Sequence, residues 1–151
     1  MILEDRFTRG FIAGLIGGVG SLAWGLFSKS ILKFTELLYT DFASILIYGN
    51  KASSFIEKAF AQFVVFGFWG LGGILFILLI PYLTSKNLIF KGAFWGAFIW
   101  FASYVITLLF KVKGLEIISV NTSISQLIGG LIWGGLLAIA IKYLDRKVKK
   151  L

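Results

Sequence analysis

The stretch GFIAGLIGGVGSLAWGLFS, residues 10–28, contains no charged side chain and decides the fold of this chain. A helix needs about 20 predominantly apolar residues to cross the hydrocarbon core of a bilayer. In lipid, a helix also satisfies its backbone N–H and C=O groups within one segment. Residues 10–28 therefore predict a membrane-spanning helix.

Three further stretches, 57–80, 90–110 and 124–143, are similarly apolar and carry their charged residues close to their ends. The chain has 151 residues, which leaves no room for a separate soluble domain beside four spans. The sequence thus predicts an all-α fold, a transmembrane four-helix bundle that forms one membrane domain over residues 1–151.

The composition excludes several kinds of chemistry. The chain has no cysteine and no histidine, which removes disulfides, thiolates, imidazole bases and the commonest zinc ligands. No Asp or Glu lies deep in a predicted span, where a proton-coupled transporter usually keeps one. We therefore expect a protein that is not an enzyme, with no catalytic residue, cofactor, metal or nucleic-acid partner.

The positions of lysine and arginine indicate the orientation in the membrane, because these residues favour cytoplasmic connections. With four spans, both ends of the chain lie on one side. That side carries nine bases and the other side six: Arg6, Arg9, Lys86, Lys91, Lys142, Arg146, Lys147, Lys149 and Lys150 against Lys29, Lys33, Lys51, Lys58, Lys111 and Lys113. We therefore expect a multi-pass protein with both termini in the cytoplasm.

The basic tail, residues 144–151, adds an expectation about partners. Bases beside a membrane attract anionic lipid headgroups by roughly 1 kcal/mol each. The simpler alternative is a stop signal followed by a solvated end.

Glycine and other small residues recur at a spacing of four in three of the four spans. Such spacing lets helix backbones approach closely, which is a main source of helix association in lipid. The first span carries Gly10, Gly14 and Gly18, the third Gly92 and Gly96, and the fourth Gly130 and Gly134. The pattern predicts close helix packing and leaves open whether the partner helix belongs to this chain or to a second copy.

A weak internal repeat relates the two halves of the chain. Arg9-Gly10-x3-Gly14 resembles Lys91-Gly92-x3-Gly96, and Gln62-x6-Trp69-Gly70 resembles Gln126-x6-Trp133-Gly134. A duplicated helical hairpin would leave both similarities in this order. Chance is the alternative, because glycine and tryptophan are abundant here.

Three tryptophans, Trp69, Trp100 and Trp133, fall near the middle of their spans. Tryptophan usually lies at the membrane interface, and a buried indole N–H needs a hydrogen-bond partner. We name these residues as candidate lining of a cavity. The alternative is that the rings fill space opposite glycines of neighbouring helices.

Residues 36–49 are too apolar for a free loop and too short to span, so they predict a short interfacial or re-entrant helix between spans one and two. Gly49 predicts a left-handed helix end. Asp41 is an acid flanked by apolar residues, and we name it as the candidate functional polar site, with Lys111 or Lys113 as its partner. The alternative is that Asp41 caps the short helix.

Two sequence patterns predict helix starts. Ser54-x-x-Glu57 and Ser123-x-x-Gln126 have the spacing of a capping box, at the beginning of the second and fourth spans. Pro81 predicts the end of the second span.

The segments 40–43 and 47–49, together with 108–112 after the third span, resemble the YqhR-like family of small, uncharacterised, four-span integral membrane proteins from spore-forming bacteria. The resemblance covers most of the chain through short apolar motifs. It implies a bacterial plasma-membrane protein and transfers no catalytic or binding residue.

These observations favour a non-enzymatic membrane component with a structural or assembly role, which associates through its glycine-rich helix faces with itself or with another membrane protein. One alternative is a small transporter or channel subunit that acts as an oligomer. A second is a holin-like protein that permeabilises membranes, suggested by the small size and the basic tail.

Overall fold

The computed structural model describes residues 5–83 and 86–148, which form five helices and no strand. Four of these helices are long and apolar enough to cross a membrane. The predicted all-α bundle with a short helix between the first two spans is confirmed. The helices are α1 (Arg6–Ser30), α2 (Tyr39–Tyr48), α3 (Phe55–Leu83), α4 (Leu88–Leu109) and α5 (Val120–Val148).

Of the helix boundaries predicted at Ser54, Ser123 and Pro81, the first is confirmed and the other two differ from the structure. The Ser54–Glu57 capping box is present, since the Glu57 N–H donates to Ser54 Oγ at 3.2 Å and the Ser54 N–H donates to Glu57 Oε2 at 3.3 Å. The start predicted at Ser123 is wrong, because α5 begins one turn earlier, where Ser119 Oγ accepts the Thr122 N–H at 3.3 Å. Helix α3 also continues past Pro81.

The predicted basic tail is not a separate segment up to residue 148. Helix α5 runs on to Val148, so residues 144–148 are helical. Residues 149–151, with Lys149 and Lys150, lie outside the described part of the chain.

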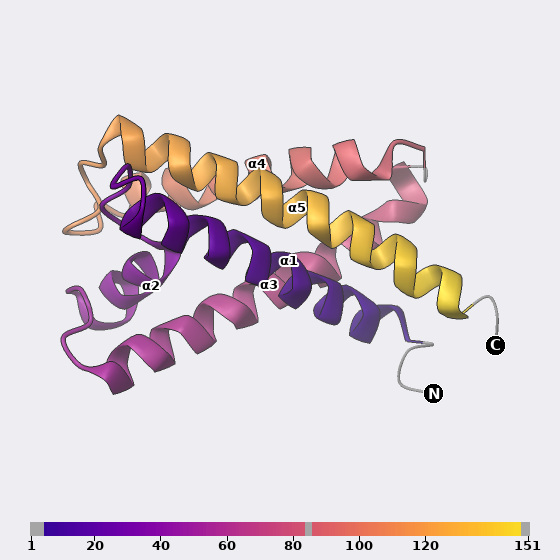
Figure 1. Cartoon of the computed structure of the whole chain (residues 1–151), viewed down its shortest axis with the longest axis horizontal. Coiled ribbons are helices and arrows are strands. Elements are labelled where there is room, and N and C mark those ends of the chain that lie inside the picture. Colours follow the sequence, from indigo (N-terminus) through magenta and orange to yellow (C-terminus); the bar gives the residue numbers. More distant parts are fainter. Residues whose placement is uncertain (1–4, 84–85, 149–151) are drawn as a thin grey trace.

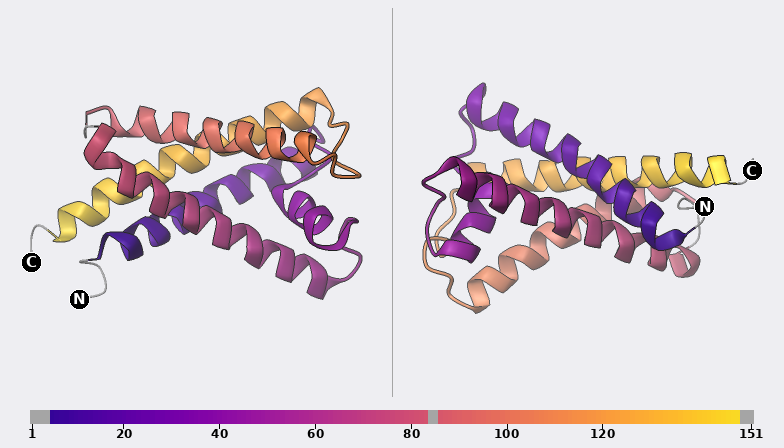
Figure 2. Two further views of the ribbon diagram at one scale, coloured as in Figure 1. Left: turned by 180° about the vertical axis from the view of Figure 1, so that it is seen from behind. Right: turned by 90° about the horizontal axis from the view of Figure 1, so that it is seen from below.

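Helices α1 and α5 form the centre of the bundle. Helix α3 packs on α1, α4 packs on α5, and the short α2 packs on α3 (Figures 1 and 2). The start of α1 and the end of α5 lie at one end of the bundle, while α2 lies near the other end (Figure 1). Both described chain ends therefore emerge on the same side, as four spans require.

The backbones of α4 and α5 touch through paired glycines. A Cβ added to Gly96 would lie 1.9 Å from the carbonyl oxygen of Gly130, and one added to Gly134 would lie 1.9 Å from that of Gly92. No side chain fits at such distances. The glycines at these positions therefore allow the helices to approach, as the sequence predicts, and the partner helix belongs to the same chain.

Helix α1 uses its glycines in the same way on two neighbours. A Cβ added to Gly14 would lie 2.2 Å from the Trp69 carbonyl oxygen, and one added to Gly10 would lie 2.6 Å from the Ile77 side chain. Trp69 and Ile77 both belong to α3. On the adjoining stripe, a Cβ at Gly17 would lie 2.5 Å from the Trp133 carbonyl oxygen of α5. Since α1 thus has backbone contact with both α3 and α5, it joins the two sides of the bundle.

The proposed repeat corresponds to the pairs α1–α3 and α4–α5, which both pack through glycines. The register differs between them, because Gly14 faces Trp69 itself, while Gly96 faces Gly130, which lies nearly one turn before Trp133. The duplication therefore stays a prediction.

Two neighbouring glycines of α5 test this packing. An alanine at Gly134 would collide with the α4 backbone, whereas a Cβ at Gly135 meets nothing within 4 Å. We expect Gly134→Ala to destabilise the protein by about 1–3 kcal/mol through overpacking, and Gly135→Ala to stabilise it by up to about 1 kcal/mol through helix propensity. Thermal unfolding in detergent measures both. Shifts of the same sign for the two variants would contradict the α4–α5 contact.

Candidate functional site

The segment between α1 and α3 enters the bundle and returns. Beyond α1, the Glu36 N–H donates to Thr122 Oγ1 at 3.1 Å, near the start of α5. Further on, the Tyr39 ring lies edge-on against Trp69, the middle residue of α3, with ring centroids 6.3 Å apart. Helix α2 then leads back outward, where the Tyr48 hydroxyl donates to the Glu57 carbonyl at 3.2 Å. Helix α2 lies within the predicted range 36–49. Residues 31–48, which enter the helix bundle and return toward the start of α3, are called the re-entrant segment of the bundle.

Helix α2 ends where the sequence indicates. Gly49 has a φ of 77°, and its N–H donates to the Ile45 carbonyl. Glycine adopts this left-handed conformation without steric cost. The chain can therefore turn from α2 directly toward α3.

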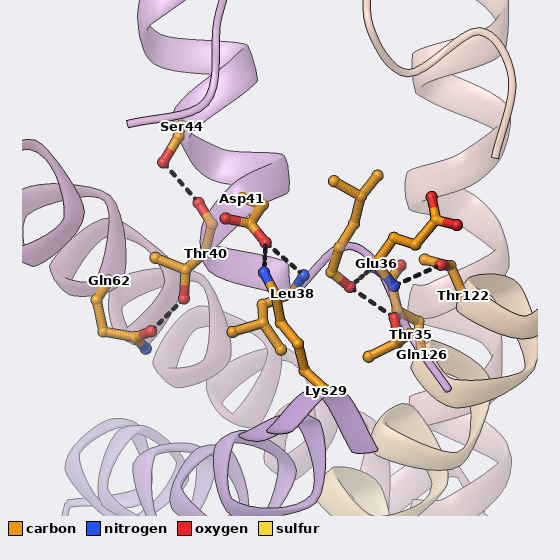
Figure 3. A network of polar contacts seen from close by, with 11 residues as sticks. Lys29, Thr35, Glu36, Leu38, Thr40, Asp41, Ser44, Gln62, Thr122 and Gln126 are labelled. Atoms are coloured by element: carbon orange, nitrogen blue, oxygen red, sulfur yellow. Dashed lines mark hydrogen bonds and ion pairs between the residues drawn. The ribbon is translucent and has the colours of Figure 1, made fainter. Parts of the chain in front are cut away.

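Asp41 fixes the entry to α2. Its Oδ2 accepts the Leu38 N–H at 2.8 Å and pairs with Lys29 Nζ at 2.8 Å (Figure 3). Asp41 thus caps α2 from its third position, by accepting the N–H of the N-cap residue Leu38, and it also forms an ion pair. The Asp41 side chain is 19% exposed and the Lys29 side chain is 37% exposed, so the pair is only partly shielded from solvent.

The predicted partners of Asp41 are wrong. Lys111 and Lys113 are exposed in the connection between α4 and α5. Lys29 lies in the last turn of α1, and the chain folds back over that turn to bring Asp41 beside it. Sequence spacing alone does not reveal this reversal.

Gln126 joins the re-entrant segment to α4 and α5. Its Nε2 donates to the Leu37 carbonyl at 3.1 Å, and its Oε1 accepts the Tyr104 hydroxyl at 3.0 Å. The Gln126 backbone carbonyl accepts the Tyr39 hydroxyl at 2.8 Å. The Gln126 side chain thus bridges the re-entrant segment and α4, and it does not cap α5. The sequence feature that indicates such a role is a polar amide within an otherwise apolar span.

On the other side of α2, Thr40 donates its hydroxyl to Gln62 Oε1 of α3 (Figure 3). The Ser44 hydroxyl donates to the Thr40 carbonyl at 2.8 Å. The re-entrant segment is therefore hydrogen-bonded to α3 as well as to α5. These bonds satisfy polar groups that would be costly to leave unpaired inside a membrane protein.

Two of the three deep tryptophans pack against glycines. The Trp133 ring lies against Gly17 and Gly72, and its Nε1 donates to the Gly14 carbonyl at 3.0 Å. The Trp69 ring lies against Gly18. The space-filling alternative therefore describes both rings.

Trp100 differs from the other two. It is half-buried, and its Nε1 is buried with no hydrogen-bond partner among the described residues. Two further indoles, which no sequence pattern singled out, link helices. Trp24 donates to the Ser125 carbonyl at 2.9 Å, and Trp95 donates to the Gly72 carbonyl at 3.1 Å.

A cavity of about 20 Å³ lies where the re-entrant segment meets α1, α3 and α5. Its lining includes Ser21 and Trp24 of α1, Tyr39 of α2, Trp69 of α3 and Gln126 of α5. Of the three tryptophans named as candidate lining, Trp69 lines this cavity, whereas Trp100 and Trp133 do not.

The opposite end of the bundle carries a second ion pair, which no sequence pattern indicated. Arg9 Nε lies 3.0 Å from Asp145 Oδ1, and the Arg9 side chain is 10% exposed. The contact joins the first turn of α1 to the last part of α5. Arg9, one of the nine bases counted for the expected cytoplasmic side, is therefore paired within the protein.

Comparisons with known proteins give no relative for this chain. No family model matches, and neither a curated protein nor a solved structure is similar to it. The resemblance to the YqhR-like family stays a prediction.

A double-mutant cycle tests the ion pair of Asp41. Removing one partner leaves the other partly buried and unpaired. We expect Asp41→Asn and Lys29→Gln each to lower the thermal stability in detergent, and the double variant to lose less than the sum, with a coupling of about 1 kcal/mol. Lys111→Gln and Lys113→Gln are the controls and should be additive with Asp41→Asn. Additivity with Lys29→Gln would refute the pair.

Proposed function

We propose that this chain is a non-enzymatic membrane component with a structural or assembly role, which associates with itself or with another membrane protein. The glycine faces pack within the chain, so association uses a different surface. The observation that supports the proposal is the outer face of α4.

Helix α4 is the least covered of the four long helices. Of the most apolar 18-residue stretch of α4, 17% is buried, whereas 56% of the corresponding stretch of α5 is buried. Its exposed face carries a ridge of phenylalanines at spacings of four, four and three: Phe90, Phe94, Phe98 and Phe101, which are 74%, 68%, 51% and 60% exposed. These spacings place the rings on one side of the helix.

Such a ridge suits contact with a protein. Helix association in lipid depends on van der Waals packing, because burying oil against oil gains little. Aromatic rings supply a large contact surface with preferred ring geometries. The ridge thus gives a partner helix more to pack against than scattered aliphatic side chains would.

Photo-crosslinking tests the assembly role. The photoreactive analogue benzoylphenylalanine replaces Phe94 on α4 or, as a control, Phe63 on α3, which is exposed to a similar extent at 73%. We expect irradiation of native membranes to join Phe94 variants to a protein of defined mass, because the ring lies in an interface, and Phe63 variants to lipid. Lipid adducts alone from both positions would contradict the proposed role.

We further propose the bacterial plasma membrane as the location, with the termini in the cytoplasm. The excess of bases near the chain ends supports this orientation. Anionic lipid headgroups are the proposed lipid partner of that end, where Arg6, Lys142 and Arg146 are exposed.

Single cysteines test the orientation, since the natural chain has none. We expect a membrane-impermeant maleimide to label Ser53→Cys in intact cells. Asn87→Cys, at the opposite end of the bundle, should react only after the membrane is opened. Labelling of Asn87→Cys in intact cells with protection of Ser53→Cys would reverse the orientation.

A further inference from the structure

The cavity beside Ser21 contains a polar atom without a partner. Ser21 is 2% exposed, and its Oγ has no hydrogen-bond partner among the described residues. An unpaired buried hydroxyl costs about 1–3 kcal/mol. A molecule in the cavity that hydrogen-bonds Ser21 removes this cost.

The lining also specifies the charge of that molecule. None of the side chains around the cavity is a carboxylate, an ammonium or a guanidinium, and Trp24, Tyr39 and Trp69 contribute aromatic rings. An ion in this place would lose its hydration without gaining a counter-charge, which is very costly. A neutral molecule is therefore favoured, and the volume of about 20 Å³ accommodates one water.

We propose that this cavity is a binding site for a small uncharged molecule that hydrogen-bonds Ser21, with water as its smallest occupant. The site lies nine residues before the end of α1 at Ser30, a depth of about 14 Å along the helix.

The re-entrant segment forms one wall of this site. Leu38 lines the cavity and packs against Gly25 of α1. A Cβ added to Gly25 would lie 3.2 Å from Leu38 Cδ2. Asp41 holds the Leu38 N–H and is itself held by Lys29. Separating this ion pair therefore loosens this wall and exposes the site further.

Cysteine reactivity tests the site directly, because Ser21→Cys is the only thiol in that variant. The thiolate is the reacting form, and it requires a hydrated environment. The probe is methyl methanethiosulfonate, which is small and neutral, and mass spectrometry gives the rate of labelling. The controls are Ala13→Cys, in the tightly packed core of the same helix at 0% exposed, and Val19→Cys, on its outer face at 58% exposed.

We expect Ser21→Cys to react at least about tenfold faster than either control. A cationic methanethiosulfonate should react with it more slowly than the neutral one. A rate as low as that of Ala13→Cys would overturn the site, and equal rates for the two reagents would overturn its preference for neutral molecules.

Asp41→Asn tests the role of this ion pair in the wall. In this background the rate at Ser21→Cys should rise while that at Ala13→Cys stays constant. An unchanged rate at Ser21→Cys would overturn the role of the ion pair.

Ser21→Ala provides a test that needs no added thiol. In an occupied site this change removes a hydrogen bond and lowers the melting temperature in detergent. In an empty site it removes an unpaired hydroxyl and raises the melting temperature. A rise would overturn the proposal.

Discussion

The fold depends on close approach of helix backbones at glycine, because lipid removes the usual reason for helices to associate. In water, burying apolar side chains would hold four helices together, but in a bilayer the lipid tails solvate them equally well. What remains is packing and hydrogen bonding. In this chain α4 meets α5 at Gly96 and Gly134, and α1 meets α3 at Gly14. Indole N–H groups add hydrogen bonds to backbone carbonyls between other pairs of helices, as Trp133 of α5 does to Gly14 of α1.

The re-entrant segment depends on this frame. A chain that enters a bundle brings backbone N–H and C=O groups with it, and each must find a partner there. Gln126 and Thr122 on α5 supply such partners, and Asp41 supplies one within the segment. The interior at this end therefore contains several polar side chains, and some of them, such as Gln126, line the cavity.

The sequence predicted the features that arise from local composition. Four spans, the helix ending at Gly49 and the close packing at Gly92 and Gly134 follow from hydropathy and spacing, and the structure contains them. It did not predict which lysine pairs with Asp41 or what Gln126 bonds, because both depend on the path of the chain after α1. The cavity itself arises where the re-entrant segment meets α1, α3 and α5, so no single stretch of sequence encodes it.

The glycine contacts join helices of one chain, and not helices of two copies. Solid-state NMR of protein with 13C-labelled glycine in lipid bilayers tests this claim most directly, when the labelled protein is diluted with an excess of unlabelled protein. The account predicts that the cross-peaks between Gly92 and Gly134 and between Gly96 and Gly130 persist on dilution. Loss of these cross-peaks on dilution would show that the contacts form between copies, and would contradict the account.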